Sequence, residues 1–442
     1  MKLTLIKPSI GRREHSLYVD EGRMEPLQLG VLAAITPPDI EIVLIDDRCE
    51  KIPYDTPTDL VAITVETFTT RRAYEISAEY RNRGVSVVLG GFHPTLIPEE
   101  ASLHADSIVI GDAETVWAGV VEDARSGNLK SIYRARPGIP QSGFMPRRDI
   151  FKGKGYLPIT LVQFGRGCRY ACNFCAISAY FNQTHSVRPV DEVIAEIEQQ
   201  ERKLILFVDD NIVADREAAK QLFRALIPLH IRWVCQGTID MAHDRELMDL
   251  MVASGCFASL IGFESIDTEV LQEMKKVPNL LEYNNYEREI ETLKEYGLQI
   301  WATFVLGHDY DTPESLRKML DFALRHKFAF AAFNVLTPYP NTPLYRKLQE
   351  EGRLLYDDKW WLHPEYRFNY APFKPAQMTA EELTQVSFDI RAKWNSFGAI
   401  LKRFFDPRTN MRTPYRMMIY WMYNPLFRKE MLKKQGMFFG RH

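Results

Sequence analysis

Three cysteines, at positions 168, 172 and 175, are the residues whose types and spacing most directly indicate chemistry. Separations of four and three residues place three thiols on one short segment, 165–176. Cysteine sulfur is the usual protein ligand of iron–sulfur clusters, and a cluster of four irons bound by three cysteines leaves one iron open to an outside ligand. A zinc site is one alternative, but zinc takes four tetrahedral ligands, and His185 is the best nearby candidate for the fourth. Buried structural cysteines are the other alternative.

The residues around this segment predict a partial α/β barrel that positions it. A β-branched and aromatic run at 157–164 predicts a strand before the cysteines, and 189–200 predicts a helix after them. Further strands are predicted at 204–208, 232–236, 258–262, 298–306 and 328–336, which gives six βα units. Ligand contacts in such barrels lie at the carboxyl ends of the strands. The polar residues at these ends are Asp209, Asp210, Gln236, Glu264 and Ser265.

The same residues also have ordinary structural roles. Asp209 and Asp210 could cap a helix, because aspartate favours that position. Glu264 could form a salt bridge at the barrel rim. The residue types alone leave both possibilities open.

The first 123 residues predict a separate α/β domain. Strands are predicted at 3–7, 41–46, 60–64, 85–89 and 107–110, with helices at 27–35 and 70–83. This alternation predicts a doubly wound, Rossmann- or flavodoxin-like parallel sheet that binds ligands at its carboxyl edge. Plain strand-to-helix turns would look similar. The residues that follow these strands are Thr64, Gly90, Gly91, His93, Thr95, Gly111 and Glu114.

The predicted domain order is an α/β domain at 1–123, a Pro- and Gly-rich linker at 124–153, the barrel at 154–345 and an aromatic, mostly helical region at 346–442. A capping arrangement at 379–382 predicts the start of a helix that runs to residue 403. The aromatic and basic tail at 415–440 fits a helix packed on the barrel or one lying on a membrane surface, and packing is the favoured interpretation.

The cysteine spacing, with Phe174 before the last cysteine, resembles the radical S-adenosylmethionine (SAM) superfamily. The Gly-Gly-x-His-Pro-Thr turn at 90–95, the Gly-Asp-Ala-Glu at 111–114 and the early 26–30 segment resemble the cobalamin-binding domain of cobalamin-dependent radical SAM enzymes, the class B-like methyltransferases and their relatives. The resemblance implies that the open iron of a 4Fe-4S cluster binds SAM. It further implies that an electron, from a donor such as flavodoxin or ferredoxin, cleaves SAM to methionine and a 5′-deoxyadenosyl radical.

The resemblance also implies residue roles. Cys168, Cys172 and Cys175 would be the catalytic cluster ligands. Phe174, Asp209, Asp210, Gln236, Glu264 and Ser265 would lie near SAM, and Thr64, Gly90, Gly91, His93, Thr95, Gly111 and Glu114 near cobalamin. Asp112 and Ala113 depart from the family's usual Gly-Glu-Gly-Glu. The Asp-x-His-x-x-Gly motif of axial-histidine proteins is absent at 46–48, which implies cobalamin bound without a protein histidine on its lower face. His93 is expected to be a hydrogen-bonding residue rather than an axial ligand.

The implied activity is methylation of an unactivated carbon in a small-molecule or lipid-like substrate. The alternatives are cyclisation, ring contraction or oxidation of a tetrapyrrole or hopanoid, and a non-catalytic cobalamin or cluster sensor. The 442 residues carry a net charge of −3 without a basic block, which argues against nucleic-acid binding. No signal peptide or bilayer-length apolar run stands out, and six cysteines suit a reducing compartment. A cytoplasmic enzyme is expected. The basic and aromatic tail leaves open a contact with the inner face of the membrane.

Overall fold

The structure is a computed structural model that describes residues 1–12, 22–138, 140, 142–280 and 286–441. The chain divides into two compact units. Unit 1 contains Met1–Leu157, Tyr356–Phe368 and Lys433–His442, and unit 2 contains Pro158–Leu355 and Asn369–Leu432.

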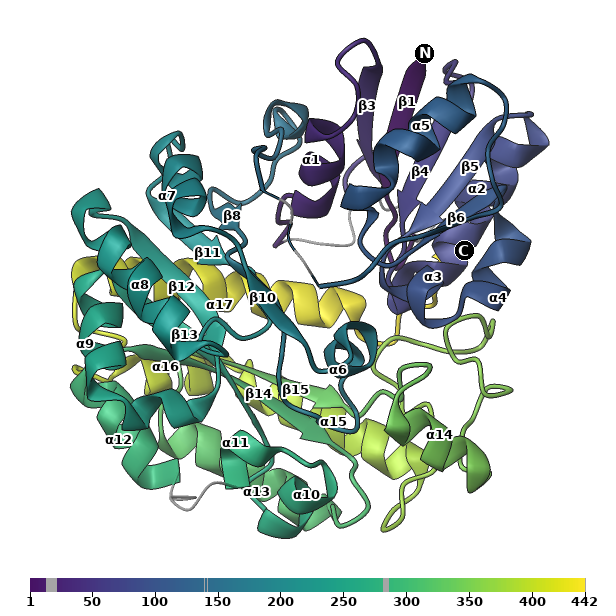
Figure 1. The fold of residues 1–442 in the computed structure, drawn as a ribbon. Coiled ribbons are helices and arrows are strands. Elements are labelled where there is room, and N and C mark those ends of the chain that lie inside the picture. The colour runs from purple at the N-terminus through teal and green to yellow at the C-terminus, as the bar shows by residue number, and fades with distance from the viewer. Residues whose placement is uncertain (13–21, 139, 141, 281–285, 442) are drawn as a thin grey trace. The chain divides into compact units, whose positions relative to one another are not determined.

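Unit 1 is built on a six-stranded parallel sheet, which confirms the predicted doubly wound fold (Figure 1). The strand order is β3-β1-β4-β5-β6-β7. Because the order reverses between β1 and β4, the topological switch point lies between these strands, where doubly wound folds bind ligands. The strands are β1 (Lys2–Lys7), β3 (Glu41–Asp46), β4 (Leu60–Thr64), β5 (Ser86–Gly90), β6 (Ser107–Ile110) and β7 (Ile132–Arg134).

Helices cover both faces of this sheet. Leu3 and Leu5 of β1 pack with α1 (Leu27–Ala34) and α5 (Trp117–Arg125), whereas Ile6 packs with α2 (Thr70–Asn82) on the other face. The two short helices α3 (Phe92–Leu96) and α4 (Pro98–Ala101) follow β5. The edge strand β7 lies inside the segment predicted as linker. It has three residues, too few for a period-2 pattern to be recognised in the sequence.

Unit 2 contains the predicted partial barrel, a six-stranded parallel sheet in the order β15-β14-β13-β12-β11-β8. An antiparallel two-stranded ribbon, β9 (Gly165–Gly167) with β10 (His185–Val187), was not predicted; it brackets the cysteine loop. The sheet strands are β8 (Thr160–Val162), β11 (Leu204–Phe207), β12 (Arg232–Gly237), β13 (Cys256–Glu264), β14 (Gln299–Leu306) and β15 (Phe330–Val335). The helices after them are α7 (Val190–Glu198), α8 (Arg216–Leu226), α9 (Arg245–Ala253), α12 (Tyr286–Glu295) and α13 (Pro313–Arg325).

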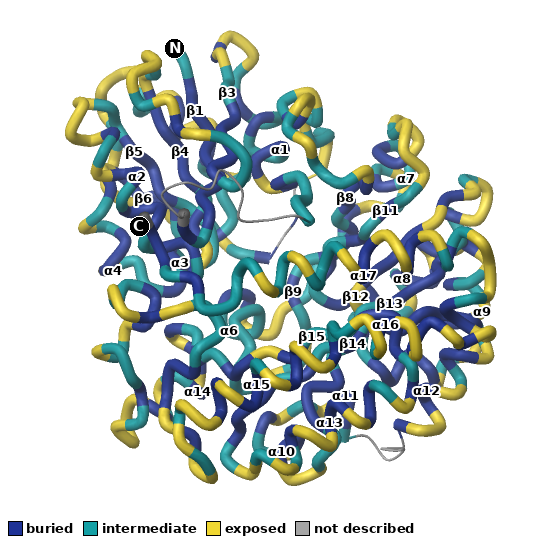
Figure 2. The backbone as a smooth tube through the Cα atoms, turned by 180° about the vertical axis from the view of Figure 1, so that it is seen from behind, coloured by how far each residue is buried: buried dark blue, intermediate teal, exposed yellow. Residues whose placement is uncertain are grey.

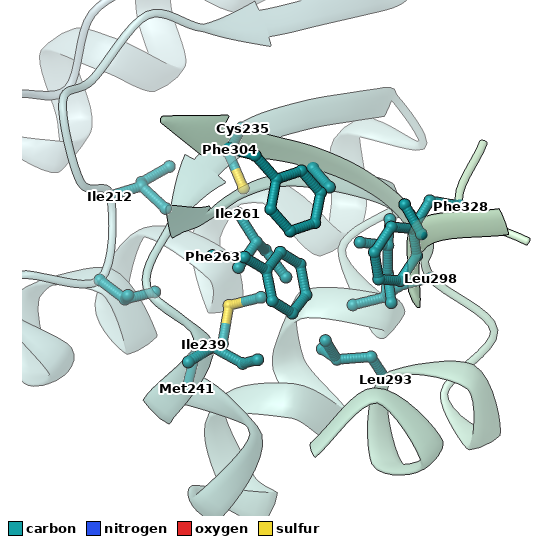
Figure 3. Close-up of a cluster of buried hydrophobic side chains, with 14 of the residues drawn as sticks. Ile212, Cys235, Ile239, Met241, Ile261, Phe263, Leu293, Leu298, Phe304 and Phe328 are labelled. Carbon is teal, nitrogen blue, oxygen red and sulfur yellow. The ribbon is translucent and has the colours of Figure 1, made fainter. Parts of the chain in front are cut away.

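The two faces of this sheet differ in burial, although the strands of both units are largely buried (Figure 2). Ile261, Phe263 and Phe304 point toward the helices and join the largest core cluster (Figure 3). Their strand neighbours Leu260, Trp301 and Thr303, on the opposite face, are only partly buried. A closed barrel fills its interior with packed side chains. The inner face of this partial barrel therefore keeps accessible surface.

The C-terminal helices pack on unit 2. The predicted capping box at Thr379 and Glu382 is confirmed at the start of α15 (Ala380–Trp394). Ser396 then caps a second helix, α16 (Phe397–Phe404), so the helix expected to continue to residue 403 is interrupted. Tyr420 and Phe427 of α17 (Pro414–Lys434) contact the ring of Phe330 in β15. Among the described residues, no helix combines the length and apolar character required to cross a bilayer.

Candidate active site

The cysteine loop connects the two strands of the β9–β10 ribbon, and two aspartates hold the first of these strands in place. Both Asp209 carboxylate oxygens accept backbone N–H groups, one from Phe164 at 3.0 Å and the other from Gly165. Asp210 accepts the N–H of Gly167 at 2.8 Å. Burial raises the pKa of Asp209 to about 7, against the lowering effect of these N–H groups. Neither aspartate caps α8, because Asp215 fills that role. Their contacts instead fix the backbone directly before Cys168.

Glycine is required at two positions of this ribbon. Gly167 has φ +81°, and a Cβ there would lie 2.2 Å from the carbonyl oxygen of Thr184. A Cβ at Gly165 would lie 2.8 Å from His185 Nε2. The Gly-Arg-Gly before the first cysteine therefore allows the two strands to approach closely.

Asn173, inside the cysteine motif, ties the loop to two distant segments. Its N–H donates to the carbonyl of Met274 at 3.1 Å, and its side-chain amide donates to the carbonyl of Glu273 at 2.7 Å. Its own carbonyl accepts the N–H of Leu344 at 3.0 Å, in the first turn of α14 (Pro343–Glu350). These hydrogen bonds set the cysteine loop against residues 273–276, at the C-terminal end of α10 (Thr268–Glu273).

All three cysteines of the motif are free thiols and share one electrostatic environment with Lys276. Burial raises the pKa of the Cys172 thiol to about 12, and the Lys276 ammonium acts in the opposite direction. The charges of Cys175 and Cys168 also raise the pKa of Cys172. Within the described ranges, no group of three or more His, Cys, Asp or Glu side chains is close enough to hold a metal ion.

Lys276 forms a buried ion pair with Glu264 at the end of β13. Its Nζ lies 3.1 Å from Glu264 Oε1, and Thr303 donates its hydroxyl to Oε2 at 3.5 Å. Burial would lower the pKa of Lys276, but the charges of Glu264 and Cys172 raise it above its ordinary value. The ammonium is therefore a fixed positive charge beside the thiols.

The backbone at Glu264 is strained to place this pair. Glu264 has φ +61°, in the left-handed region, and a register shift lies between Gly262 and Glu264 in the pairing of β13 with β14. Such conformations in a non-glycine residue cluster at functional sites. Ser265 is fully buried and accepts the N–H of Asp267 at 3.1 Å, so it forms the following turn.

The remaining predicted residues of unit 2 lie around the same strand ends. Gln236, near the end of β12, is exposed and paired in register with inner-face Leu260. Phe174 packs against the core and contacts the ring of His308, with centroids 6.0 Å apart. His308 follows β14; burial lowers its pKa to about 3, and its Nε2 has no partner.

In unit 1, most of the predicted cobalamin residues lie on adjacent strand ends. Thr64 ends β4 and pairs in register with Gly90 at the end of β5. Gly91 has φ +105°, and a Cβ there would lie 3.0 Å from the carbonyl oxygen of Val65. Thr95 donates its hydroxyl to the Gly91 carbonyl and accepts the N–H of Gly111, each at 2.9 Å. The turns after β5 and β6 are therefore linked into one edge. Glu114, partly buried, lies in the short helix after Gly111.

His93 is not accessible at this edge. Its side chain is 0% exposed, and Nε2 lies 3.1 Å from Glu100 Oε1. The same carboxylate accepts Trp361 Nε1–H at 2.9 Å and pairs with Lys359 at 2.9 Å. His93 is thus part of an internal polar cluster, in line with the expectation of a hydrogen-bonding histidine.

Sequence reasoning missed Lys276, Asn173 and His308. Lys276 is one of two adjacent lysines in a loop, a pattern that usually marks solvated surface. Asn173 lies inside the motif, but its three partners are 100 residues or more away in sequence. His308 directly follows a predicted strand end, the one signal that could have identified it.

Residues 162–323 match the sequence profile of the radical SAM superfamily. The chain is 29% identical over 416 residues to the bacteriochlorophyllide d C-12(1)-methyltransferase of Chlorobaculum tepidum, covering 91% of this chain and 89% of that protein. It is 25% identical over 353 residues to the hopanoid C-2 methylase of Rhodopseudomonas palustris, covering 76% of this chain and 66% of that protein.

Two solved structures share the fold. The radical S-adenosylmethionine methyltransferase TsrM from Kitasatospora setae, solved with cobalamin and a [4Fe-4S] cluster, has a TM-score of 0.63 at 18% identity, covering 79% of this chain and 75% of that one. The cobalamin-dependent S-adenosylmethionine radical enzyme OxsB, with aqua-cobalamin bound, has a TM-score of 0.66 at 14% identity, covering 98% of this chain and 72% of that one. The profile match runs from the last residue of β8 through most of α13 and includes the cysteine loop. This chain therefore carries a radical SAM domain.

Proposed function

We propose that the chain is a cobalamin-dependent radical SAM methyltransferase that methylates an unactivated carbon of an apolar, small-molecule or lipid-like substrate. The observation that carries the proposal is the cysteine loop, held by Asp209, Asp210 and Asn173 at the strand ends of a barrel whose inner face is accessible.

The donor set fits a 4Fe-4S cluster. In such a cluster each cysteine binds its own iron, so the three thiolates need not converge on one point. Cys168, Cys172 and Cys175 would hold it, and the Lys276 ammonium offsets part of their negative charge. When bound, the cluster supplies the electron for reductive cleavage of SAM. An electron donor such as flavodoxin or ferredoxin would have to deliver that electron.

The polar residues beside the loop suit the charged ends of SAM. Lys276 presents an ammonium suited to a carboxylate, and Glu264 presents a carboxylate suited to ribose hydroxyls. Gln236 adds an exposed amide on the same inner face. Asp209 and Asp210 act as positioning residues, because their oxygens accept the N–H groups of the ribbon.

The carboxyl edge of unit 1 suits a corrin ring. Gly91 and Gly111 let the turns after β5 and β6 lie close against the backbone of Val65 and Ala135, and the edge adjoins the switch point of the sheet. Thr64, Thr95 and Glu114 supply polar groups there. His93 would support the turn and would not bind cobalt, since its ring is buried against Glu100.

The inner face of the barrel favours an apolar substrate. Leu206, Leu260, Trp301, Val305 and Ala332 are partly accessible there, and the polar side chains among them are Gln236, Thr303 and Asn334. The relatives named for bacteriochlorophyllide and hopanoid substrates are consistent with this class of substrate.

The test uses anaerobically reconstituted protein with SAM and a reductant. We expect 5′-deoxyadenosine to form, and a product one methylene unit heavier than the substrate. In Cys172→Ala, cluster absorbance and SAM cleavage should both be lost, whereas Cys235→Ala, a buried core thiol, should retain both. A product without added mass would indicate cyclisation or oxidation instead. Absence of 5′-deoxyadenosine with every candidate substrate would favour a sensor.

A further inference from the structure

The outer face of the two last helices of unit 2 carries an unusual concentration of exposed apolar side chains. Seven of the twelve exposed large hydrophobic residues in the described part of the chain lie on these helices or at the C-cap of α16, and six of them, from Trp421 at 41% exposed to Phe397 at 68%, make up one surface. We call this surface the α16–α17 face. Its residues are Phe397, Leu401, Phe405, Met418, Trp421 and Met422.

These residues form one continuous surface. Phe397, Leu401 and Phe405 follow each other at intervals of four, along one side of α16 and its C-cap. Met418, Trp421 and Met422 have the equivalent spacing on α17, and exposed positions recur along both helices (Figure 2). The helices are in direct contact, because the rings of Phe404 and Trp421 lie 5.1 Å apart and the guanidinium of Arg428 lies 4.6 Å from the Phe397 ring centroid.

The surface rests on a fixed base. Arg403, on the inner side of α16, is fully buried and donates to the carbonyls of Phe328, Ala329 and Trp394 at 3.0–3.2 Å. Tyr420 donates its hydroxyl to the carbonyl of Ile400 at 2.6 Å. The exposed apolar side chains are thus presented by packed helices and do not belong to a frayed end.

Positive charge is concentrated on the same helices. Residues 393–432 contain eight Lys or Arg and two Asp or Glu, although the whole chain has a net charge of −3. Arg403, Arg416 and Asp406 are buried, which leaves one acidic residue, Glu430, near the surface. The basic residues that are not buried are Lys393, Lys402, Arg408, Arg412, Arg428 and Lys429; Arg408 among them pairs with Glu291 of α12 at 2.7 Å.

We propose that the α16–α17 face docks on the surface of an anionic lipid bilayer. Aromatic and aliphatic side chains flanked by Lys and Arg are the composition of helices that lie in the membrane interface, with apolar groups at headgroup depth and basic groups on phosphates. A second copy of the chain fits less well, because a two-fold contact would bring this excess of positive charge against itself.

The inference deepens the proposed function, since an enzyme docked on lipid would meet an apolar substrate where that substrate dissolves. It does not depend on the reaction, because the face lies outside the residues assigned to SAM and the cluster. The two claims can therefore fail separately.

Vesicle sedimentation tests the proposal with the full chain. We expect binding to phosphatidylcholine vesicles that contain phosphatidylglycerol, little binding to pure phosphatidylcholine, and release by high salt. The variant Phe397→Ser/Leu401→Ser/Met422→Ser should bind at least tenfold more weakly. Leu103→Ser, which removes a side chain 74% exposed in unit 1, is the matched control and should bind normally.

A charge variant keeps the test independent of the serine variant's folding. Lys393→Glu/Lys402→Glu should weaken binding at least tenfold, since each basic residue at an anionic surface contributes about fivefold. SAM cleavage should be unchanged in all these variants. Failure of the wild type to bind anionic vesicles would overturn the proposal. So would a concentration-dependent dimer in light scattering that the serine substitutions abolish, because the face would then belong to a second copy.

Discussion

Replacing Gly262 by alanine is the sharpest probe of the Glu264–Lys276 ion pair. An added Cβ at this position would lie 2.2 Å from Glu264 Oε1 and 3.1 Å from Lys276 Nζ. Gly262 has no positive φ, so alanine fits the strand backbone itself. The substitution therefore acts on the two charged side chains and forces the carboxylate away from its place against the strand.

The expected magnitude follows from what the displaced groups lose. A charge-assisted hydrogen bond contributes about 1.5–3 kcal/mol. If Lys276 and Glu264 both contact SAM, misplacing them should weaken SAM binding by roughly ten- to a hundredfold, since 1.4 kcal/mol corresponds to a factor of ten. The cysteine loop is held by separate contacts through Asp209, Asp210 and Asn173. Cluster loading should therefore be unchanged.

Equilibrium dialysis of SAM with anaerobically reconstituted protein measures the effect, and iron and sulfide content reports the cluster. Gly237→Ala is the matched control in the neighbouring strand, because its Cβ would meet the flexible Met241 sulfur at 3.3 Å rather than the ion pair. SAM binding of Gly262→Ala at wild-type affinity would show that the pair does not position SAM. Loss of the cluster in this variant would show that the loop depends on the pair.

Three further predictions concern other parts of the chain. Asn173→Ala removes the hydrogen bond from the Asn173 side-chain amide to the Glu273 carbonyl, so iron content after reconstitution should fall at least severalfold. The control Asn182→Gly, at an exposed position with a left-handed backbone, should load iron normally. Gly91→Ala should destabilise its turn by about 1–3 kcal/mol and reduce corrin uptake, while the cluster still loads. Gly119→Ala, whose added Cβ would meet no other atom within 4 Å, is the control. Unchanged corrin uptake in Gly91→Ala would contradict the proposed cobalamin site at this edge. Burial and the charge of Asp240 raise the pKa of Glu289, whose Oε1 lies 3.1 Å from His243 Nε2, to about 7, so the folded state loses stability as pH rises from about 4.5 through 7. Glu289→Gln should reduce that loss between pH 5 and pH 8, measured by denaturant unfolding at both pH values.

The sequence predicted the regular elements well because the βα alternation repeats a strong local signal. Every strand of the partial barrel and five of the six strands of the first sheet were predicted within a few residues. The exceptions are short. The three-residue edge strand β7 and the β9–β10 ribbon have too few residues for a period, and glycines in β9 lower its strand propensity further.

The site was predicted less completely, because a motif fixes which residues meet a ligand but not which residues hold the motif. Asp209 and Asp210 were singled out by their place after a strand, yet the backbone contacts that they make depend on a ribbon that has no sequence signal. Lys276 is the stronger case. A lysine in a loop is nearly always solvated, and the hydrogen bonds from Asn173 to the carbonyls of residues 273 and 274 hold the segment of this one against the cysteine loop. Its partner Glu264 depends in turn on the absence of a side chain at Gly262. The charge next to the cysteines is thus set by a glycine and an asparagine that each act through another residue, and single-residue patterns do not record such dependence.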